Sequence, residues 1–418
     1  MNLNMEMKKY KLGDIADINK QTLSKKDSMD VIEYLDTGSL TENIFGPKQV
    51  LSRKEAPSRA QRRVFDKTIL YSTVRPRLKH YGFLESPKEN TIVSTGFATI
   101  DVKDEFKNVI DARYLYLLLI QDKVTEYLGT IADTAVSAYP SLNPSDIQSL
   151  EFEFPDMPIQ KKVASFLCNI DKRIENLRAQ NRVLEQTAKT IYDYTFLQCA
   201  GHQTTYNKTL NRNIPANWEV CSIGDYIKEN KGGDWGKENP EKNYNLQVSC
   251  IRGADIDKMV DLPVRYILTK NSSKLLQEFD LVVEISGGSP TQSTGRSRLI
   301  TKELLEKFDN KLICSNFCQA ITMKNPLYAY YISFMWKMFY DNGIFFNFEG
   351  KTSGIKNFQL DQFVETIWFF PDPKTVEKFN AQVAPLLKKQ QVNTKQIETL
   401  TTQRNTLLPL LMTGQVEV

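Results

Sequence analysis

The chain has 418 residues, of which 41% are hydrophobic and 25% charged, and its formal net charge is +4. This is the balance of a folded protein with two or three domains. Its apolar runs, such as 114–120, are too short for a membrane span, and residues 1–9 lack an apolar signal core, so we expect a cytoplasmic protein with no membrane contact.

Histidine and cysteine are too sparse for several kinds of site. The only histidines are His80 and His202, which excludes a histidine-rich metal site. The six cysteines form no Cys-x-x-Cys pair, which argues against a zinc ribbon and against a disulfide framework. The sequence therefore predicts no metal site.

Positive charge is concentrated between Arg53 and Lys79. This stretch contains nine Lys and Arg residues against two acidic ones, a local charge of +7, so the rest of the chain carries about −3. A cationic patch on a nearly neutral protein indicates a polyanionic partner. A solvated, arginine-rich loop remains the alternative.

Strands and short helices are expected around this patch, followed by one long helix. Residues 93–102 and 150–154 are rich in β-formers, and 114–128 is expected to form a short helix. From Val163 the apolar residues then recur in steps of four and three, the heptad period of a coiled coil. The positions expected to pair with another helix are Val163, Leu167, Ile170, Ile174, Leu177, Asn181, Leu184 and Ile191.

The second half has the same plan. Residues 328–340 are expected to be a short helix, and the heptad period returns after Phe379 with polar residues at Gln390, Asn393 and Arg404. The apolar pairing positions are Val383, Leu386, Ile397, Leu400, Leu407 and Leu411. Two amphipathic helices that each pack on their own domain would be the alternative, but a strict 3.5-residue period favours pairing.

Short segments of the two halves resemble each other in the same order. Residues 11–15, 65–70, 92–97 and 146–156 correspond to 221–226, 279–283, 312–317 and 361–372, at a spacing of about 211 to 221 residues. We therefore predict an α+β protein with two similar domains and two long helices, paired as an antiparallel coiled coil with a pseudo-twofold internal repeat. The expected parts are a domain at 1–156, a helix at 157–200, a domain at 201–372 and a helix at 373–418.

The ends of both repeats resemble those of the DNA specificity subunits of type I restriction-modification enzymes. Residues 400–416, with Leu408-Pro409 and Leu411-Met412, resemble the closing signature of that family, and residues 159–171 resemble the opening of its central helix. Residues 71–76 resemble a strand and loop of many of its target recognition domains, whereas the second repeat has Glu284–Pro290 instead.

The resemblance implies a function. Each domain would read half of a split double-stranded DNA target, and the paired helices would set the spacing and dock two methylation subunits that bind S-adenosylmethionine. Motor-nuclease subunits can join this complex. The chain itself would have no catalytic residues and no cofactor. At about 1.5 Å per residue the first helix spans roughly 40 Å, or about 10–12 base pairs between half-site centres.

Candidate DNA-binding residues lie in two loops of each repeat. Arg suits guanine and phosphate, and a proline such as Pro76 stiffens its loop. In the first repeat the candidates are Arg59, Arg62, Arg63, Tyr71, Ser72, Thr73, Arg75, Arg77, Lys79, Ser137 and Tyr139. In the second they are Ser286, Ser289, Gln292, Thr294, Arg296, Arg298, Lys351, Thr352, Ser353, Lys356 and Asn357.

Two segments imitate catalytic motifs. Asn325–Tyr328 nearly matches the Asn-Pro-Pro-Tyr box of adenine methyltransferases but lacks its second proline, so we interpret it as a helix start. Glu349-Gly350-Lys351 matches part of a nuclease site, without a suitably spaced upstream carboxylate, and we expect a loop. A self-contained methyltransferase or nuclease and a coiled-coil scaffold with protein-binding domains remain the alternatives.

Overall fold

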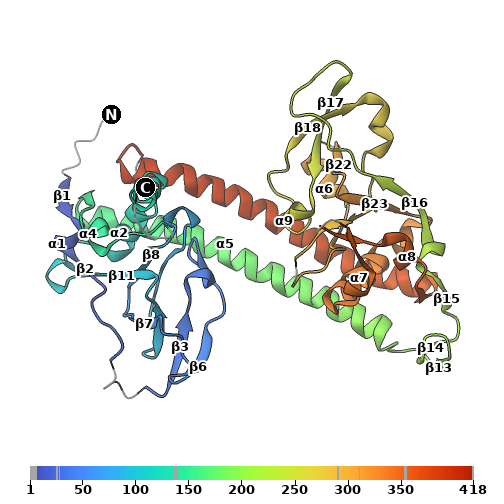
Figure 1. Ribbon diagram of the computed structural model, residues 1–418, viewed down its shortest axis with the longest axis horizontal. Coiled ribbons are helices and arrows are strands. Elements are labelled where there is room, and N and C mark those ends of the chain that lie inside the picture. Colours follow the sequence, from blue (N-terminus) through green and yellow to red (C-terminus); the bar gives the residue numbers. More distant parts are fainter. Residues whose placement is uncertain are drawn as a thin grey trace. The chain divides into compact units, whose positions relative to one another are not determined.

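The computed structural model describes residues 7–24, 27, 29–134, 140–289, 291–309, 311–352 and 355–416, with the backbone alone at 351, 352 and 355. It divides the chain into two compact units (Figure 1). The first unit comprises Met1–Glu175 and Glu398–Val418, and the second unit comprises Asn176–Ile397. In this described part of the chain, no helix combines the length and the apolar character needed to cross a membrane.

The first unit contains two four-stranded sheets, ordered β2–β11–β8–β9 and β6–β3–β10–β7, and an antiparallel pair of β1 with β12. The strands are β1 (Lys8–Lys11), β2 (Ala16–Ile18), β3 (Val31–Leu35), β4 (Leu40–Thr41), β5 (Ile44–Phe45), β6 (Gln49–Ser52), β7 (Ala60–Arg63), β8 (Ile69–Ser72), β9 (Tyr81–Phe83), β10 (Thr91–Ser94), β11 (Phe97–Val102) and β12 (Glu151–Phe154). The short helices are α1 (Leu12–Ile15), α2 (Ala112–Leu119), α3 (Asp122–Asp133) and α4 (Pro144–Gln148).

The second unit repeats this arrangement. Its sheets have the orders β16–β23–β19–β21 and β18–β17–β22, and β15 pairs with β26. The strands are β13 (Thr204–Asn207), β14 (Arg212–Pro215), β15 (Glu219–Ser222), β16 (Ile227–Gly232), β17 (Tyr244–Ile251), β18 (Val264–Leu268), β19 (Leu281–Glu284), β20 (Ser286–Gly287), β21 (Ser297–Leu299), β22 (Leu312–Cys314), β23 (Cys318–Met323), β24 (Glu349–Thr352), β25 (Ile355–Phe358) and β26 (Ile367–Phe370). The short helices are α6 (Lys302–Lys307), α7 (Ala329–Asp341) and α8 (Leu360–Val364).

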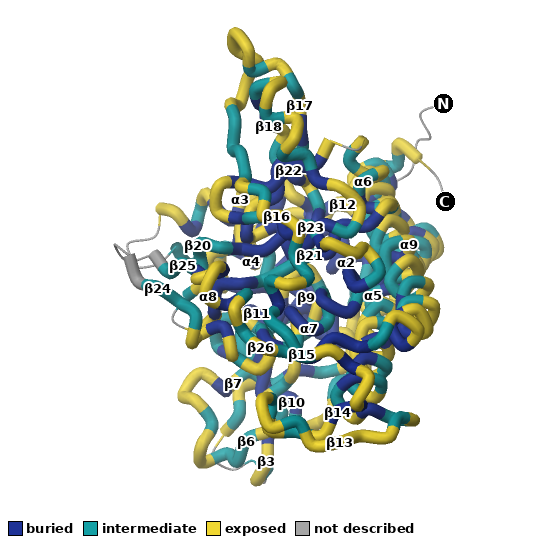
Figure 2. Tube along the Cα trace, turned by 90° about the vertical axis from the view of Figure 1, so that its right-hand side faces the viewer, coloured by how far each residue is buried: buried dark blue, intermediate teal, exposed yellow. Residues whose placement is uncertain are grey.

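The pairing of the strands confirms the internal repeat. In both units a central strand has one antiparallel and one parallel neighbour: β3 lies between β6 and β10, and β17 lies between β18 and β22. The central strands β8, β10, β11, β19 and β22 are buried along their whole length, as the dark blue of β10 and β11 shows in Figure 2. Their apolar residues form the cores on which the surface loops are mounted.

A buried polar pair is exchanged between the two repeats. In the first unit the Thr68 hydroxyl donates to the Asp101 carboxylate, and in the second the Thr322 hydroxyl donates to Asp280 at 2.5 Å. The register aligns Asp101 with Thr322, so threonine and aspartate have changed places across neighbouring strands. Such an exchange keeps the hydrogen bond, which a buried carboxylate requires.

The two long helices, α5 (Met157–Tyr192) and α9 (Pro373–Met412), form antiparallel contacts within each unit. In the first unit Arg404 lies 2.9 Å from Asp171. In the second, Asn181 contacts Thr394 and Asn393 contacts Gln180, both at 3.3 Å. In the second unit the ring of Tyr192 also packs against Phe379, so partner numbers fall along α9 as they rise along α5 from Asn181, which confirms the antiparallel pairing. Every expected pairing position is buried or half-buried, as the heptad assignment requires.

The structure corrects three expected elements. The strand at 93–102 is interrupted by a turn at Thr95–Gly96, and the helix at 114–128 is two helices separated at Ile120–Gln121. Glu349–Lys351 is not a loop but part of β24, because it pairs with β25.

Asn181 and Asn393 form a polar layer in the helix pair. Replacing both residues tests whether this layer lowers the stability of the pair. The Oδ1 atoms of both residues are buried without a hydrogen-bond partner in the described part of the chain. We expect the double variant Asn181→Leu/Asn393→Leu to raise the free energy of unfolding by about 1–3 kcal/mol, which thermal melting of the full chain measures. The control Leu177→Ala should lower the melting temperature. A double variant less stable than the wild type would show that these amides stabilise the pair.

Candidate nucleic-acid interface

In each unit the two candidate loops lie side by side, joined by backbone pairing at equivalent positions. In the first unit Val74 forms an isolated bridge with Ser141. In the second, Ser286 pairs with Asn357. Both Val74 and Ser286 stand two residues beyond a buried central strand, β8 or β19. The repeat therefore brings together segments about 70 residues apart and presents them on one surface of each unit.

The loop after β8 has a fixed backbone. Arg75 and Lys79 have left-handed φ values of 48° and 56° and flank the single turn Pro76–Leu78. The Arg75 amide donates to the carbonyl of Pro140 at 3.0 Å. Non-glycine residues in this conformation persist only where their surroundings hold them, and such residues concentrate at functional sites. The Arg75 side chain is exposed on this rigid turn.

Two cations of this loop stabilise the unit rather than facing outward unpaired. Arg77 lies 2.9 Å from Glu126 and 2.6 Å from Asp133, and Lys79 lies 2.8 Å from Asp122. Hydrogen bonds to Glu126 and Asp133 raise the pKa of Arg77, and the bond to Asp122 raises the pKa of Lys79. The local charge of +7 counted in the sequence is thus partly neutralised by α3.

A second group of cations surrounds β7, an edge strand. Arg59 is exposed just before this strand, and no described carboxylate lies within ion-pair distance of it. Arg62 is half-buried and donates to the hydroxyl of Thr22 at 3.5 Å, and burial lowers its pKa. Arg63 lies 3.3 Å from Asp27. Arg59 is therefore the exposed member of this group, and it can contact a phosphate without losing a carboxylate partner.

The corresponding surface of the second unit is held by two buried carboxylates. Glu284, which is 2% exposed, accepts two hydrogen bonds from Arg296, at 2.9 and 2.7 Å. Glu349 accepts the Thr294 amide at 2.8 Å and pairs with Lys356 at 2.8 Å. These contacts fix both loops, and the role of Glu349 in them is structural.

Several candidates do not face solvent. Tyr71 and Ser72 are 1% and 2% exposed because they belong to the buried strand β8, and burial raises the pKa of Tyr71 to about 12. Thr294 is fully buried. We expected these three residues to contact DNA, and their burial contradicts this. Thr73 is half-buried and donates to the Gly96 carbonyl at 3.0 Å.

The remaining candidates either have described positions in the second unit or lie outside the residues that the structure describes. Ser286 donates to Asn357, Ser289 contacts Thr291 at 3.3 Å, and Gln292 is exposed. Arg298 lies in a pocket of the second unit. Ser137, Tyr139 and Ser353 lie outside the described residues, as do the side chains of Lys351 and Thr352.

The methyltransferase-like segment has the structural role expected for it. Pro326–Tyr328 is a single turn that leads into α7, and the Asn325 side chain accepts the Leu327 amide at 3.0 Å. Asn325 is therefore a helix cap.

Comparison with known proteins shows a likeness to one family. The family model for the type I restriction modification DNA specificity domain matches residues 4–186. The MjaIX specificity subunit of Methanocaldococcus jannaschii is 25% identical over 421 residues, which are 99% of this chain and 89% of that protein. Residues 4–186 thus match the type I specificity domain, and the chain as a whole is similar to a type I restriction enzyme specificity subunit.

Two further family members resemble it. The HindI specificity subunit of Haemophilus influenzae is 28% identical over 195 residues, 46% of this chain and 41% of that protein. The S subunit of a type I restriction-modification system of M. genitalium has a TM-score of 0.59 at 16% identity, covering 98% of this chain and 97% of that one. This last likeness supports the two-unit fold of the family.

Sequence reasoning missed the residues that hold the candidate loops in place. Pro140 and Ser141 hold the Arg75 turn, but nothing in the sequence marks them apart from the proline. Val74 and Ser286 occupy equivalent positions in the two repeats. This correspondence is the signal from which the contact between the two loops of each unit could have been predicted.

The two arginines of the first loop should separate DNA contact from bracing. Arg75→Ala is expected to weaken binding to a duplex selected from a random pool by about 1–3 kcal/mol, measured by fluorescence anisotropy. Arg77→Ala should instead lower the melting temperature, because it loses two carboxylate partners of α3.

The matched control is Arg173→Ala, an exposed arginine of α5. It removes the same charge away from both loops and should leave binding unchanged. If Arg75→Ala bound with wild-type affinity and specificity, Arg75 would not belong to the interface.

Proposed function

We propose that this chain directs a type I restriction-modification complex to a split DNA sequence, each unit reading one half of it. The observation that carries the proposal is the pair of loops that recurs at equivalent positions in both units. The scaffold under the loops is repeated, whereas the side chains on them differ. A duplicated support with two different polar surfaces suits the recognition of two different half-sites.

Phosphate and base contacts would be divided between two parts of the first unit. Arg59, exposed beside an edge strand, suits a phosphate contact. Arg75 extends from a rigid turn, which suits a base contact because the side chain is positioned before binding. The interface would then combine salt-dependent affinity with a fixed geometry for sequence reading.

The long helices would provide the docking surface for methylation subunits. Lys172, Arg173 and Glu175 of α5 are exposed, close in sequence to Asp171, which contacts α9. Motor-nuclease subunits would join the same complex. In this proposal the chain binds no cofactor and has no catalytic role, and S-adenosylmethionine is held by the methylation subunits. Because the proposed target is genomic DNA, we propose that the protein acts in the cytoplasm.

A coiled-coil scaffold that binds only proteins is the second candidate, favoured by the neutralisation of Arg77 and Lys79. Counterion release distinguishes the two, because the affinity of a DNA reader falls steeply with salt. A scaffold would show no such binding.

The decisive experiment maps adenine methylation in the host genome by single-molecule sequencing, with and without this gene. We expect deletion to abolish methylation at one bipartite motif whose half-site centres lie about 10–12 base pairs apart, as the helix length suggests. Complementation with wild-type protein should restore the motif.

A variant altered in the loops of one unit only makes the test sharper. Replacing Arg75 should alter or abolish methylation of one half-site while the other half-site stays recognisable. A continuous target, or a methylome that is unchanged although the methylation subunits are expressed and bound, would contradict the proposal.

A further inference from the structure

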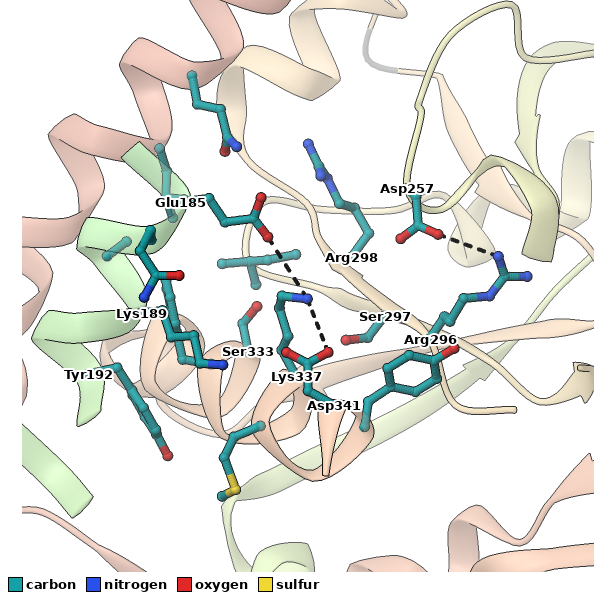
Figure 3. A pocket seen from close by; sticks show the side chains of 18 of the residues that line it. Glu185, Lys189, Tyr192, Asp257, Arg296, Ser297, Arg298, Ser333, Lys337 and Asp341 are labelled. Atoms are coloured by element: carbon teal, nitrogen blue, oxygen red, sulfur yellow. Dashed lines mark hydrogen bonds and ion pairs between the residues drawn. The ribbon is translucent and has the colours of Figure 1, made fainter. Parts of the chain in front are cut away.

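The second unit contains a cavity of about 780 Å³ among α5, α7, α9 and the edge strand β21. Ten of its lining residues are labelled in Figure 3. Hydroxyl and amide groups contribute to the wall, among them Ser297, Ser333, Gln186 and Gln390. This volume and this mixture of polar and apolar walls are those of small-molecule sites.

Most charges in this cavity are already paired. Lys337 of α7 lies 3.9 Å from Glu185 and 3.3 Å from Asp341. Arg296 lies 3.4 Å from Asp257, in addition to its bonds with Glu284. The dashed lines in Figure 3 mark the contacts of Lys337 and the one between Arg296 and Asp257. Lys337 and Arg296 are therefore already engaged with carboxylates.

Arg298 is the exception. Its side chain points into the cavity between Glu185 and Asp257 (Figure 3), yet among the described residues its guanidinium makes no hydrogen bond or ion pair. Burial lowers the pKa of Arg298. A guanidinium that has no hydrogen-bond or ion-pair partner gains strong, directional hydrogen bonds when it binds an anion.

Two more cations add to this excess of positive charge. Arg182 and Lys189 of α5 line the cavity, and neither forms an ion pair with a described carboxylate. Asp193 is the one lining acid outside the pairs above. Over the whole lining, five cations face four acids, a net charge of +1, and the three cations outside these pairs are the ones that an anion can bind.

At the position equivalent to Arg298, the first unit has no open space. The register aligns Arg298 with Gly82 of β9, since each lies opposite the second residue of the neighbouring strand, Val282 or Leu70. A Cβ added at Gly82 would lie 2.8 Å from Phe45 and 2.9 Å from Leu40. The space that Arg298 reaches into is thus filled by apolar side chains in one unit and open in the other.

We propose that this cavity is a binding site for a small organic phosphate of nucleotide size. Arg298 binds the phosphate through its planar fork of donors, and Lys189 and Arg182 contribute charge from α5. The remaining volume accommodates the organic part against Phe334 and the hydroxyl and amide groups of the wall. The bound anion joins β21 to α5 and so stabilises the second unit.

The test uses the full chain with three probes: inorganic phosphate, ADP and ATP, each without divalent cations. Sodium chloride at matched ionic strength is the reference. We expect a nucleotide to raise the melting temperature above this reference and to bind with a stoichiometry of one in calorimetry. Inorganic phosphate alone should bind more weakly, because it leaves most of the cavity empty.

Two variants assign the effect. Arg298→Gln should weaken nucleotide binding by about tenfold or more, because it removes the guanidinium that binds the phosphate, and should melt within a few degrees of the wild type in the absence of ligand, because Arg298 makes no hydrogen bond or ion pair with a described residue. Lys189→Gln, at an exposed position that does not endanger folding, should weaken binding by a smaller factor. The matched control Lys208→Gln, exposed in the turn between β13 and β14 and outside the cavity lining, should bind as the wild type does.

Three outcomes overturn the inference. Absence of stabilisation and of calorimetric binding by all three probes does so. Equal binding by the wild type, Arg298→Gln and Lys189→Gln would show non-specific anion binding. If Arg298→Gln lost affinity for duplex DNA while nucleotide binding was absent, Arg298 would belong to the DNA interface instead.

Discussion

Each unit is closed by one strand pair, and the rest of the unit depends on it. β1 pairs with β12 in the first unit and β15 pairs with β26 in the second, both antiparallel over four residues. The second strand of each pair leads within a few residues into a long helix. The chain therefore enters and leaves each globule at the same edge, and the start of each helix is fixed to the sheet behind it.

Buried hydrogen bonds strengthen this junction differently in the two repeats. Gln160, 1% exposed near the start of α5, accepts the Asp111 amide and donates to the carbonyls of Val109 and Pro155. In the second unit the Tyr328 hydroxyl donates to the Pro371 carbonyl at 2.8 Å. Because the junction is fixed in both cases, loops on the opposite side of the strands can change without disturbing the helix. This separation explains how one scaffold carries Val74 beside Ser141 in one unit and Ser286 beside Asn357 in the other.

The sequence was sufficient for features with a period and insufficient for features made by distant contacts. The 3.5-residue spacing identified the helix pair because every apolar position repeats the same environment, and the repeat located equivalent strands such as β10 and β22. The roles of single loop residues were not predictable. Arg77 is neutralised by Glu126 and Asp133, about 50 residues away, and only the tertiary structure reveals these partners. Tyr71 was misjudged because its polar hydroxyl suggested a surface, whereas β8 is buried on both faces.

The polar layer of the helix pair explains why a duplicated chain keeps one register. Asn181 and Asn393 each bond to the residue next to the other, so the two amides lie in one layer. Counted from Pro155 and Pro371, their counterparts in the repeat are Ile397 and Leu177, which are apolar. The helix pair is therefore asymmetric at this level. A shift by one heptad would place each amide against an apolar residue and leave four polar groups without any partner, whereas an all-apolar seam would tolerate that shift. The buried amides reduce stability, and in return they make the correct alignment the most favourable one. Under the proposed function, in which the helix length sets the distance between two half-sites, alignment is the property that function requires most.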